Sequence, residues 1–258
     1  MSIYWHKLIQ RLGVKLFLQW LSLKAIMLIR FNKDFHSIMK TIDMNRFKVL
    51  QEKYDLPHRK GSGIKYLNIS EYIPVHLKRA YSLNLHNAKP LNILDIGTGP
   101  GYFPHICNHF GHKTMSIDLG DIPVYNDAIS FLKIDRKVWT VKAFEKLPDF
   151  GKKFDLITAF RVVFNNHSRP SDVWGVDEWE FFLKDLTHNL LTENGRVFLD
   201  LNAEKARAHL LLHGRFDDAL LKFFIEHGAE INYSQVYFKS MEKFRDRLPE
   251  KSHWVEVA

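Results

Sequence analysis

The stretch "ILDIGTGPGYF", residues 93–103, decides the fold, because three glycines at alternate positions follow an apolar run that contains one acid. A short apolar run that ends in glycines predicts a buried strand turning sharply into a helix. Glycine has no Cβ, so a ligand can lie against the main chain at such a turn. The stretch therefore predicts a ligand site at the carboxyl end of a strand.

The glycine spacing argues against two kinds of phosphate site. A P-loop ends in Gly-Lys-Ser/Thr, whereas Gly101 is followed here by Tyr102 and Phe103, so that site is excluded. A dinucleotide-binding turn has the spacing G-x-G-x-x-G, and Gly101 comes one position too early for it. A nicotinamide cofactor is disfavoured but stays open.

Two acids accompany the glycines. Asp95 lies on the first predicted strand, and Asp118 ends the second. A carboxylate at the tip of the second strand can accept hydrogen bonds from both hydroxyls of a ribose. Glycines and acids together describe a pocket for a nucleoside without a pyrophosphate.

From residue 91 onward, short β-branched or apolar runs alternate with amphipathic stretches. This pattern is typical of an α/β fold, in which helices cover both faces of a parallel sheet. The predicted strands are residues 92–96, 114–118, 138–141, 154–160 and 196–201.

The last third of the chain predicts two helices and a hairpin. Residues 177–194 have helical apolar spacing with Gly195 as the expected C-cap, and residues 217–227 form a second helix closed by Gly228. "AEINYSQVYF" predicts two strands joined by a turn at residues 232–234. The expected fold is a Rossmann-like doubly wound sheet with an antiparallel terminal hairpin and an N-terminal helical extension.

Five segments carry a family resemblance: "LDIGTGPGYF", "SID", "AFEKLP", "FDLITAF" and "LLTENGRVFLDLN". In this order they resemble the class I S-adenosylmethionine-dependent methyltransferases, over roughly residues 91–239. The resemblance implies S-adenosyl-L-methionine as cofactor and methyl transfer as activity. We expect a basic, mainly helical extension or lid at 1–90, the methyltransferase domain at 91–240 and a C-terminal tail at 241–258.

The resemblance also implies roles for the glycines and acids. Gly97, Gly99 and Gly101 would line the methionine part of the cofactor. Asp95 would bind near the amino group of that part, and Asp118 would bind the ribose hydroxyls.

Two further cofactor contacts follow from the resemblance. Ala143 stands where the family commonly has an acid for the adenine amino group, so the backbone of Phe144 and apolar packing would contact adenine instead. Phe160 and Arg161, which end the fourth strand, would lie beside the sulfonium.

The methyl acceptor is expected at the loop after the fourth strand, "RVVFNNHSRPSDVWG", which is rich in polar side chains. It lacks the Asn/Asp-Pro-Pro-Tyr/Phe motif of methyltransferases that act on amino groups. His167 is the candidate general base, with an exposed loop histidine as the alternative, and Arg161 and Asn165 are candidate contacts. Asp200 and Asn202 are further candidates.

The cysteine and histidine content predicts no metal. The single cysteine, Cys107, excludes a disulfide framework and a cysteine-rich zinc site, and it favours a reducing compartment such as the cytoplasm. His105, His109 and His112 are expected on a solvated helix face without a nearby acid, so a metal site is not predicted there.

The basic charge belongs to the N-terminal third. Residues 1–90 hold 16 Lys and Arg against 5 Asp and Glu, whereas residues 91–258 hold 21 against 24. Residues 3–31 predict an amphipathic helix, and Lys15 and Lys24 interrupt its apolar face too often for a transmembrane span. We favour a lid packed on the catalytic domain, and the alternative is a helix lying in an anionic membrane surface.

The leading hypothesis is a cytoplasmic methyltransferase that acts on a hydroxyl of a small-molecule, glycan or lipid-linked acceptor. An RNA methyltransferase that uses the basic N-terminal third is a second hypothesis, disfavoured because no RNA-binding module is recognisable. The third is a protein that binds S-adenosylmethionine without catalysis.

Overall fold

A sheet of seven strands forms the centre of the computed structural model, which describes residues 22, 24–54, 63–162, 164, 174–201 and 218–245. The strand order is β3-β2-β1-β4-β5-β7-β6. Strands β1 to β5 pair in parallel, whereas β7 is antiparallel to both β5 and β6. The expected Rossmann-like α/β fold with an antiparallel terminal hairpin is confirmed. The strands are β1 Asn92–Ile96, β2 Lys113–Asp118, β3 Arg136–Val138, β4 Phe154–Phe160, β5 Leu191–Asp200, β6 Glu230–Asn232 and β7 Gln235–Phe238.

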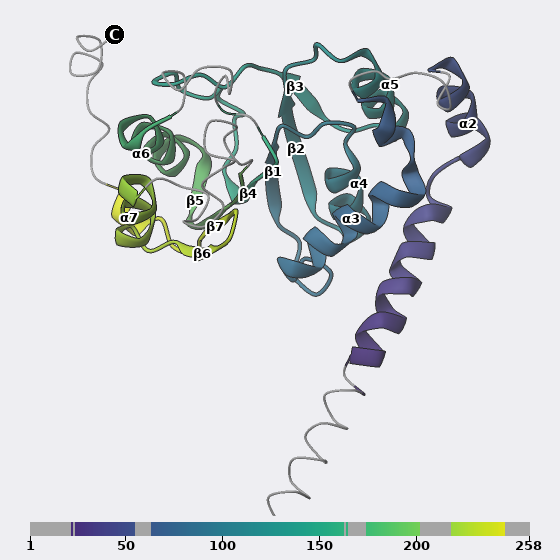
Figure 1. Cartoon of the computed structure of the whole chain (residues 1–258), viewed down its shortest axis with the longest axis horizontal. Helices are drawn as coiled ribbons and strands as arrows, with labels where there is room; N and C mark the ends of the chain where they lie inside the picture. The colour runs from purple at the N-terminus through teal and green to yellow at the C-terminus, as the bar shows by residue number, and fades with distance from the viewer. Residues whose placement is uncertain are drawn as a thin grey trace, which may run out of the picture.

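Helices cover both faces of the sheet (Figure 1). Side chains of a strand point alternately to opposite faces, so Ile93 belongs to one hydrophobic core and Leu94 to the other. The Ile93 core is closed by α2 Met44–Lys53, α3 Ile69–Ser82, α4 Tyr102–His109 and α5 Pro123–Leu132. The Leu94 core is closed by α6 Val176–Asp185 and α7 Asp218–Glu226.

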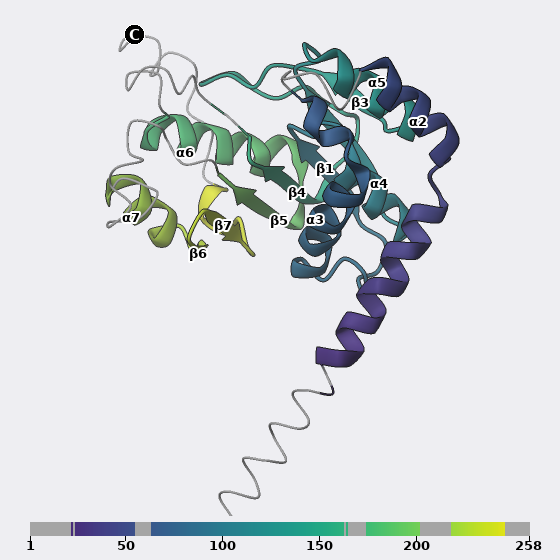
Figure 2. The same cartoon turned by 45° about the vertical axis from the view of Figure 1, so that its right-hand side comes forward.

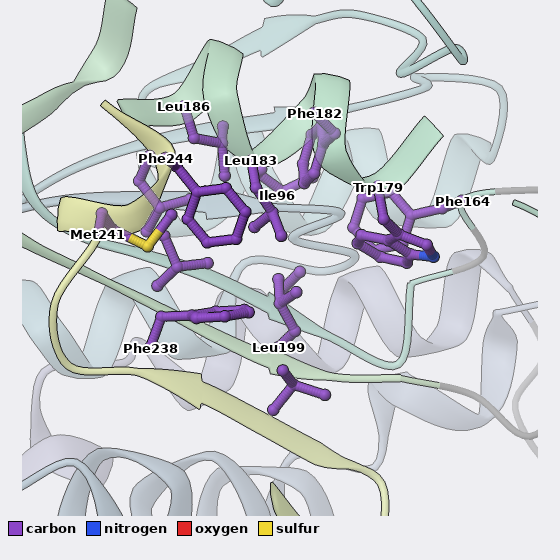
Figure 3. Packing of buried hydrophobic residues seen from close by; sticks show 14 of the residues in the cluster. Ile96, Phe164, Trp179, Phe182, Leu183, Leu186, Leu199, Phe238, Met241 and Phe244 are labelled. Carbon is purple, nitrogen blue, oxygen red and sulfur yellow. The ribbon is translucent and has the colours of Figure 1, made fainter. Parts of the chain in front are cut away.

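The Leu94 core is rich in aromatic rings (Figure 3). Trp179 and Phe182 of α6 pack in edge-to-face geometry with ring centroids 5.8 Å apart, an arrangement that stabilises beyond the area it buries. Met241 and Phe244, from the predicted C-terminal tail, are also buried in this core. The described part of the tail therefore packs on the sheet domain.

Two expected boundaries are wrong. Gly195 is not a helix C-cap, because α6 passes through the π-helical turn Leu186–Leu190 directly into β5. The pairing of β5 with β4 jumps from Leu191 to Arg196, and this bulge accommodates Gly195 within the strand. Strand β3 occupies Arg136–Val138 instead of 138–141, because only residues 136–138 pair with β2 at the edge of the sheet.

The end of the chain agrees with its prediction. Gly228 has a left-handed φ of 85° just after α7, and the Ala229 N–H donates to the Phe224 carbonyl across the helix end, 2.9 Å away. The turn at residues 233–234 joins β6 to β7.

Most of the predicted helix at residues 3–31 lies outside the described residues, but residues 24–40 are helical. The carboxyl half of this helix is anchored: Ile38 is fully buried, and the Tyr81 hydroxyl donates to Asp34 over 2.7 Å. Residues 24–29 are exposed, because here the helix extends beyond the body of the protein (Figures 1 and 2), whereas Arg30 donates a hydrogen bond to the His86 carbonyl. The favoured packing as a lid is therefore wrong for residues 24–29. Within the described residues, no helix has the length and apolarity to cross a membrane.

Candidate functional site at the carboxyl edge of the sheet

A cavity of about 700 Å³ opens where β1, β2 and β4 end. This volume lies within the usual range of small-molecule sites. Open α/β sheets bind ligands at this edge, at the point where the strand order reverses. Five residues expected from the sequence line the cavity: Gly97, Gly99, Asp118, Phe160 and Arg161.

The three glycines differ in what surrounds them. All have left-handed φ angles, of 68° at Gly97, 57° at Gly99 and 84° at Gly101. A Cβ on Gly97 would lie 2.4 Å from Val162, and one on Gly101 would lie 2.9 Å from Ile134, so tight packing requires both glycines. A Cβ on Gly99 would meet nothing nearer than 3.9 Å. Gly101 does not line the cavity, and Gly99 leaves its backbone accessible from it.

Asp118 is held in place by the main chain. Its Oδ2 accepts the Gly99 N–H over 2.7 Å, and its Oδ1 accepts the Leu119 N–H over 2.8 Å. Burial raises the pKa of this carboxyl above its ordinary value, and the two amides oppose that shift. Each oxygen still has a lone pair for a ligand hydroxyl, so the amides orient the carboxylate and leave part of its hydrogen-bonding capacity for a ligand.

Asp95 lies beneath the glycine turn and is 2% exposed. Its Oδ1 accepts the Thr158 hydroxyl over 2.7 Å. Burial raises the pKa of Asp95 to about 6, and the Thr158 hydrogen bond opposes this rise. Asp95 is not among the described residues that line the cavity, so any contact with a ligand there requires a small local shift or a water.

The expected adenine contact lies elsewhere than on the cavity wall. Phe144 has a left-handed φ of 57° and packs on Phe181, with ring centroids 5.8 Å apart. In the same loop, the residues that line the cavity are Trp139, Thr140 and Val141. They follow β3 directly and stand three to five positions before Phe144.

Arg161 adopts a strained backbone conformation at the end of β4, with φ 58°. Asp200 of β5 holds it twice: its carbonyl accepts the Arg161 N–H over 2.6 Å, and its Oδ2 accepts from Nε over 3.1 Å. The Ser234 hydroxyl donates to the other carboxylate oxygen over 2.7 Å. Asp200, expected as an acceptor contact, thus positions Arg161.

One whole wall of the cavity was not predicted. It comes from the basic N-terminal third, where Tyr72, His76 and Arg79 of α3 line the cavity. These residues stand at positions i, i+4 and i+7, which share one face of a helix. That polar and aromatic stripe was the available signal. Further lining residues are Lys65, Tyr66 and Val75.

The remaining predicted residues are His167, Asn165 and Asn202, which lie outside the described residues. The described part of the chain holds no group of three or more His, Cys, Asp and Glu placed to bind a metal. The expectation of a solvated face for His112 is wrong. Its ring is buried, accepts the Leu91 N–H over 3.1 Å and donates to the Leu85 carbonyl over 2.9 Å.

No protein-family model matches the chain, and no curated protein matches it either. Solved structures do. A TehB-like SAM-dependent methyltransferase from Corynebacterium glutamicum is 18% identical with a TM-score of 0.41, over 61% of this chain and 83% of that chain. A SAM-dependent methyltransferase from Archaeoglobus fulgidus is 18% identical with a TM-score of 0.39, over 60% and 68%. The 1,6-didemethyltoxoflavin-N1-methyltransferase of Burkholderia thailandensis, solved with S-adenosylhomocysteine bound, is 18% identical with a TM-score of 0.37, over 60% and 62%.

Proposed function

We propose that this protein is an S-adenosylmethionine-dependent methyltransferase. The observation that carries the proposal is the cavity itself, which joins an accessible glycine backbone and the half-buried carboxylate of Asp118 to an aromatic and basic helix face. Bound S-adenosylmethionine supplies a methyl group on a sulfonium, already activated for in-line displacement. The protein then has to bind the cofactor, align the acceptor and exclude water.

The geometry of the cavity supports a contact for each part of the cofactor. Asp118, oriented by two backbone amides, accepts the ribose hydroxyls. Gly99 lets the ligand approach the main chain, since no protein atom occupies the space of its missing Cβ within 3.9 Å. Trp139 and Val141 supply the apolar wall for the adenine. Asp95, which lies beneath the glycine turn, attracts the amino group of the methionine part of the cofactor.

The acceptor we propose is a hydroxyl of a small molecule, because aromatic side chains line the cavity together with the cofactor residues. Tyr66, Tyr72 and Tyr125 are among them, with the ring centroids of Tyr66 and Tyr72 4.7 Å apart. Such a wall suits a compact ligand with an apolar body. His167 takes the proton of the hydroxyl, and Asn165 helps to hold the acceptor.

The cofactor assignment is tested by calorimetry with S-adenosylhomocysteine and with NAD. We expect binding of the former alone. Asp118→Ala removes two hydrogen bonds to a charged acceptor, each contributing about 1.5–3 kcal/mol, so the affinity for S-adenosylhomocysteine falls by ~100-fold or more. Asp121→Ala, an exposed acid three residues away, is the matched control and keeps the affinity. Binding of NAD without S-adenosylhomocysteine would overturn the assignment.

Catalysis is tested separately, by transfer of a labelled methyl group to fractionated cell extract. Incorporation into a small-molecule fraction is the expected result. Incorporation into RNA points to the second hypothesis of the sequence analysis, and cofactor binding without incorporation points to the third.

We also propose that the N-terminal segment contacts an anionic membrane surface. Four consecutive large apolar side chains, at residues 26–29, are 58–69% exposed on the part of the helix that leaves the body of the protein. Residues 1–33 hold six Lys and Arg and no Asp or Glu. Exposed apolar groups next to uncompensated positive charge are typical of segments that bind anionic lipid.

Vesicle sedimentation tests this contact. The full chain should sediment with vesicles that contain phosphatidylserine, and less so at high salt, because salt screens exposed charges. A chain that lacks residues 1–29 keeps Arg30 and Phe31, which pack on the body, and should stay in the supernatant yet bind S-adenosylhomocysteine. The double substitution Ile26→Ser/Ile29→Ser should reduce sedimentation, whereas Val49→Ser, at an exposed site on α2, should not. Equal sedimentation of all variants contradicts the proposal.

A further inference from the structure

Arg79 places a positive charge inside the cavity. It belongs to the last turn of α3, and its guanidinium carbon lies 4.5 Å from the centre of the Phe160 ring. Phe160 ends β4, next to β5, whereas Asp118 lies at the tip of β2 on the other side of β1. The guanidinium therefore lies on the β4 side of the cavity, away from the carboxylate proposed to hold the ribose.

Within the described part of the chain, the guanidinium has one polar partner, and that partner is a neutral group. Arg79 Nη1 donates to His76 Nδ1 over 3.2 Å, so the proton of the His76 ring is on Nε2. Burial lowers the pKa of His76 well below its ordinary value, and the positive charge of Arg79 lowers it further. His76 can thus orient Arg79 but cannot neutralise it.

The acids around Arg79 are already engaged. Asp200 accepts hydrogen bonds from Arg161 and Ser234, and Asp95 accepts one from Thr158. Among the residues that the structure describes, no carboxylate oxygen lies within the 4.0 Å of an ion pair with Arg79. Burial lowers the pKa of Arg79 from its ordinary value, and the charges of Asp200 and Asp95 oppose that shift without forming an ion pair with it. A half-buried cation without a carboxylate in contact is costly, and an anionic ligand offsets part of that cost.

We propose that Arg79 binds a carboxylate of the methyl acceptor, so that the substrate class is a small hydroxy acid. We expect the ligand to carry one negative charge, because one guanidinium of α3, that of Arg79, lines the cavity without a carboxylate in contact. The contact with Phe160 and the hydrogen bond from Nη1 to His76 position the guanidinium, and Nε and Nη2, which have no hydrogen-bond partner among the described residues, can donate two parallel hydrogen bonds to a carboxylate. The identification of this ligand as the methyl acceptor rests on the proposed methyltransferase function, whereas the anion site itself does not.

The test uses the full chain and the variant Arg79→Met, which removes the charge and keeps most of the side-chain length. Lys78→Met, at the neighbouring exposed position of α3, is the matched control for loss of one positive charge. Arg79→Lys keeps the charge without the planar fork. Thermal unfolding of each variant establishes that it folds; if Arg79→Met does not, Arg79→Lys carries the comparison.

The first measurement is ligand-observed NMR with a panel of small hydroxy acids, each paired with its neutral amide, with and without saturating S-adenosylhomocysteine. We expect acids of the panel to bind the unsubstituted protein about 10- to 100-fold more tightly than their amides. The preference should be lost in Arg79→Met, reduced in Arg79→Lys and kept in Lys78→Met. Absence of any preference for acids, or a preference that survives Arg79→Met, overturns the proposal.

The second measurement separates the acceptor from the carboxylate of the cofactor itself. S-adenosylhomocysteine carries a carboxylate, and 5′-methylthioadenosine does not. If Arg79 serves the acceptor, Arg79→Met leaves both affinities unchanged. A loss of about 10-fold or more for S-adenosylhomocysteine alone assigns Arg79 to the cofactor and overturns the proposal. If neither nucleoside binds the unsubstituted protein, the methyltransferase function fails, while the acid preference measured without cofactor still tests the anion site.

Discussion

The two walls of the cavity are built in different ways. The sheet-edge wall, with Gly97, Gly99 and Asp118, is made of main-chain geometry: left-handed turns and a carboxylate held by two backbone amides. The α3 wall, with Tyr72, His76 and Arg79, is made of side chains that project from one helix face. The sheet-edge wall depends on the conformation of the backbone, whereas the α3 wall depends on the identity of the side chains on the helix.

This difference separates a general function from a specific one. Many sequences can keep the same turn at the sheet edge, because backbone conformation tolerates change elsewhere. Any substitution at Tyr72, His76 or Arg79 alters the shape or charge offered to the second ligand. The sheet-edge wall therefore suits a constant cofactor, and the α3 wall suits the recognition of one acceptor.

The strongest test of this contrast compares two glycines of the sheet-edge wall. Gly97→Ala should lower the free energy of unfolding by about 2–6 kcal/mol, because its φ is left-handed and its Cβ would clash with Val162. Gly99→Ala should cost only about 1–3 kcal/mol, the backbone strain alone, yet should abolish binding of S-adenosylhomocysteine. Chemical denaturation and calorimetry measure the two quantities. Equal destabilisation by both substitutions would show that Gly99 is also a packing residue.

A second test concerns the acid beneath the sheet-edge wall. Burial raises the pKa of Asp95 from 3.8 to about 6, so the folded protein holds a proton that the unfolded chain releases between these values. The contribution of Asp95 to the free energy of unfolding is therefore most favourable below pH 3.8, and it is lost as the pH rises through 6.

Asp95→Asn should remove this penalty, which is on the order of 3 kcal/mol above pH 6. The variant should be more stable than the unsubstituted protein at pH 8 and should lose that advantage near pH 4, while its affinity for S-adenosylhomocysteine falls. Denaturation at the two pH values and calorimetry at pH 8 check this. A variant that is destabilised at pH 8 would show that the charged carboxylate supports the fold.

The smallest expected effect concerns the acceptor side. His167→Ala should lower turnover by about 100-fold, or ~2.7 kcal/mol, without changing cofactor affinity, because a general base acts on the hydroxyl alone. Single-turnover methyl transfer and calorimetry separate the two effects. Near-normal turnover would mean that the loop after β4 holds the acceptor without taking its proton.

Local patterns were sufficient for the bounds of β1 and β4 and for the glycine turn. The runs at 92–96 and 154–160 became β1 and β4 with the expected bounds, because buried parallel strands are nearly continuous apolar runs. The pattern failed for β5, which begins at Leu191, since the bulge opposite β4 has no local signature. The backbone contact expected from Phe144 stays a prediction: the ring of Phe144 packs on Phe181, and in its loop Trp139, Thr140 and Val141 line the cavity.

What the sequence determined by itself was the turn and the acid of the sheet-edge wall, because D-x-G-x-G-x-G after one strand and an acid at the end of the next are local patterns. The contact between them, from the Gly99 N–H to Asp118, depends on the pairing of β1 with β2. Only the tertiary structure brought α3 across that edge. Its contact with α4 depends on burial of Ile73 and Leu77, apolar residues that any amphipathic helix carries and that name no partner. The binding role proposed for Arg79 likewise depends on the tertiary structure. A guanidinium on a basic helix is ordinary in sequence and becomes a binding group when packing places it over Phe160, with the nearby acids engaged elsewhere.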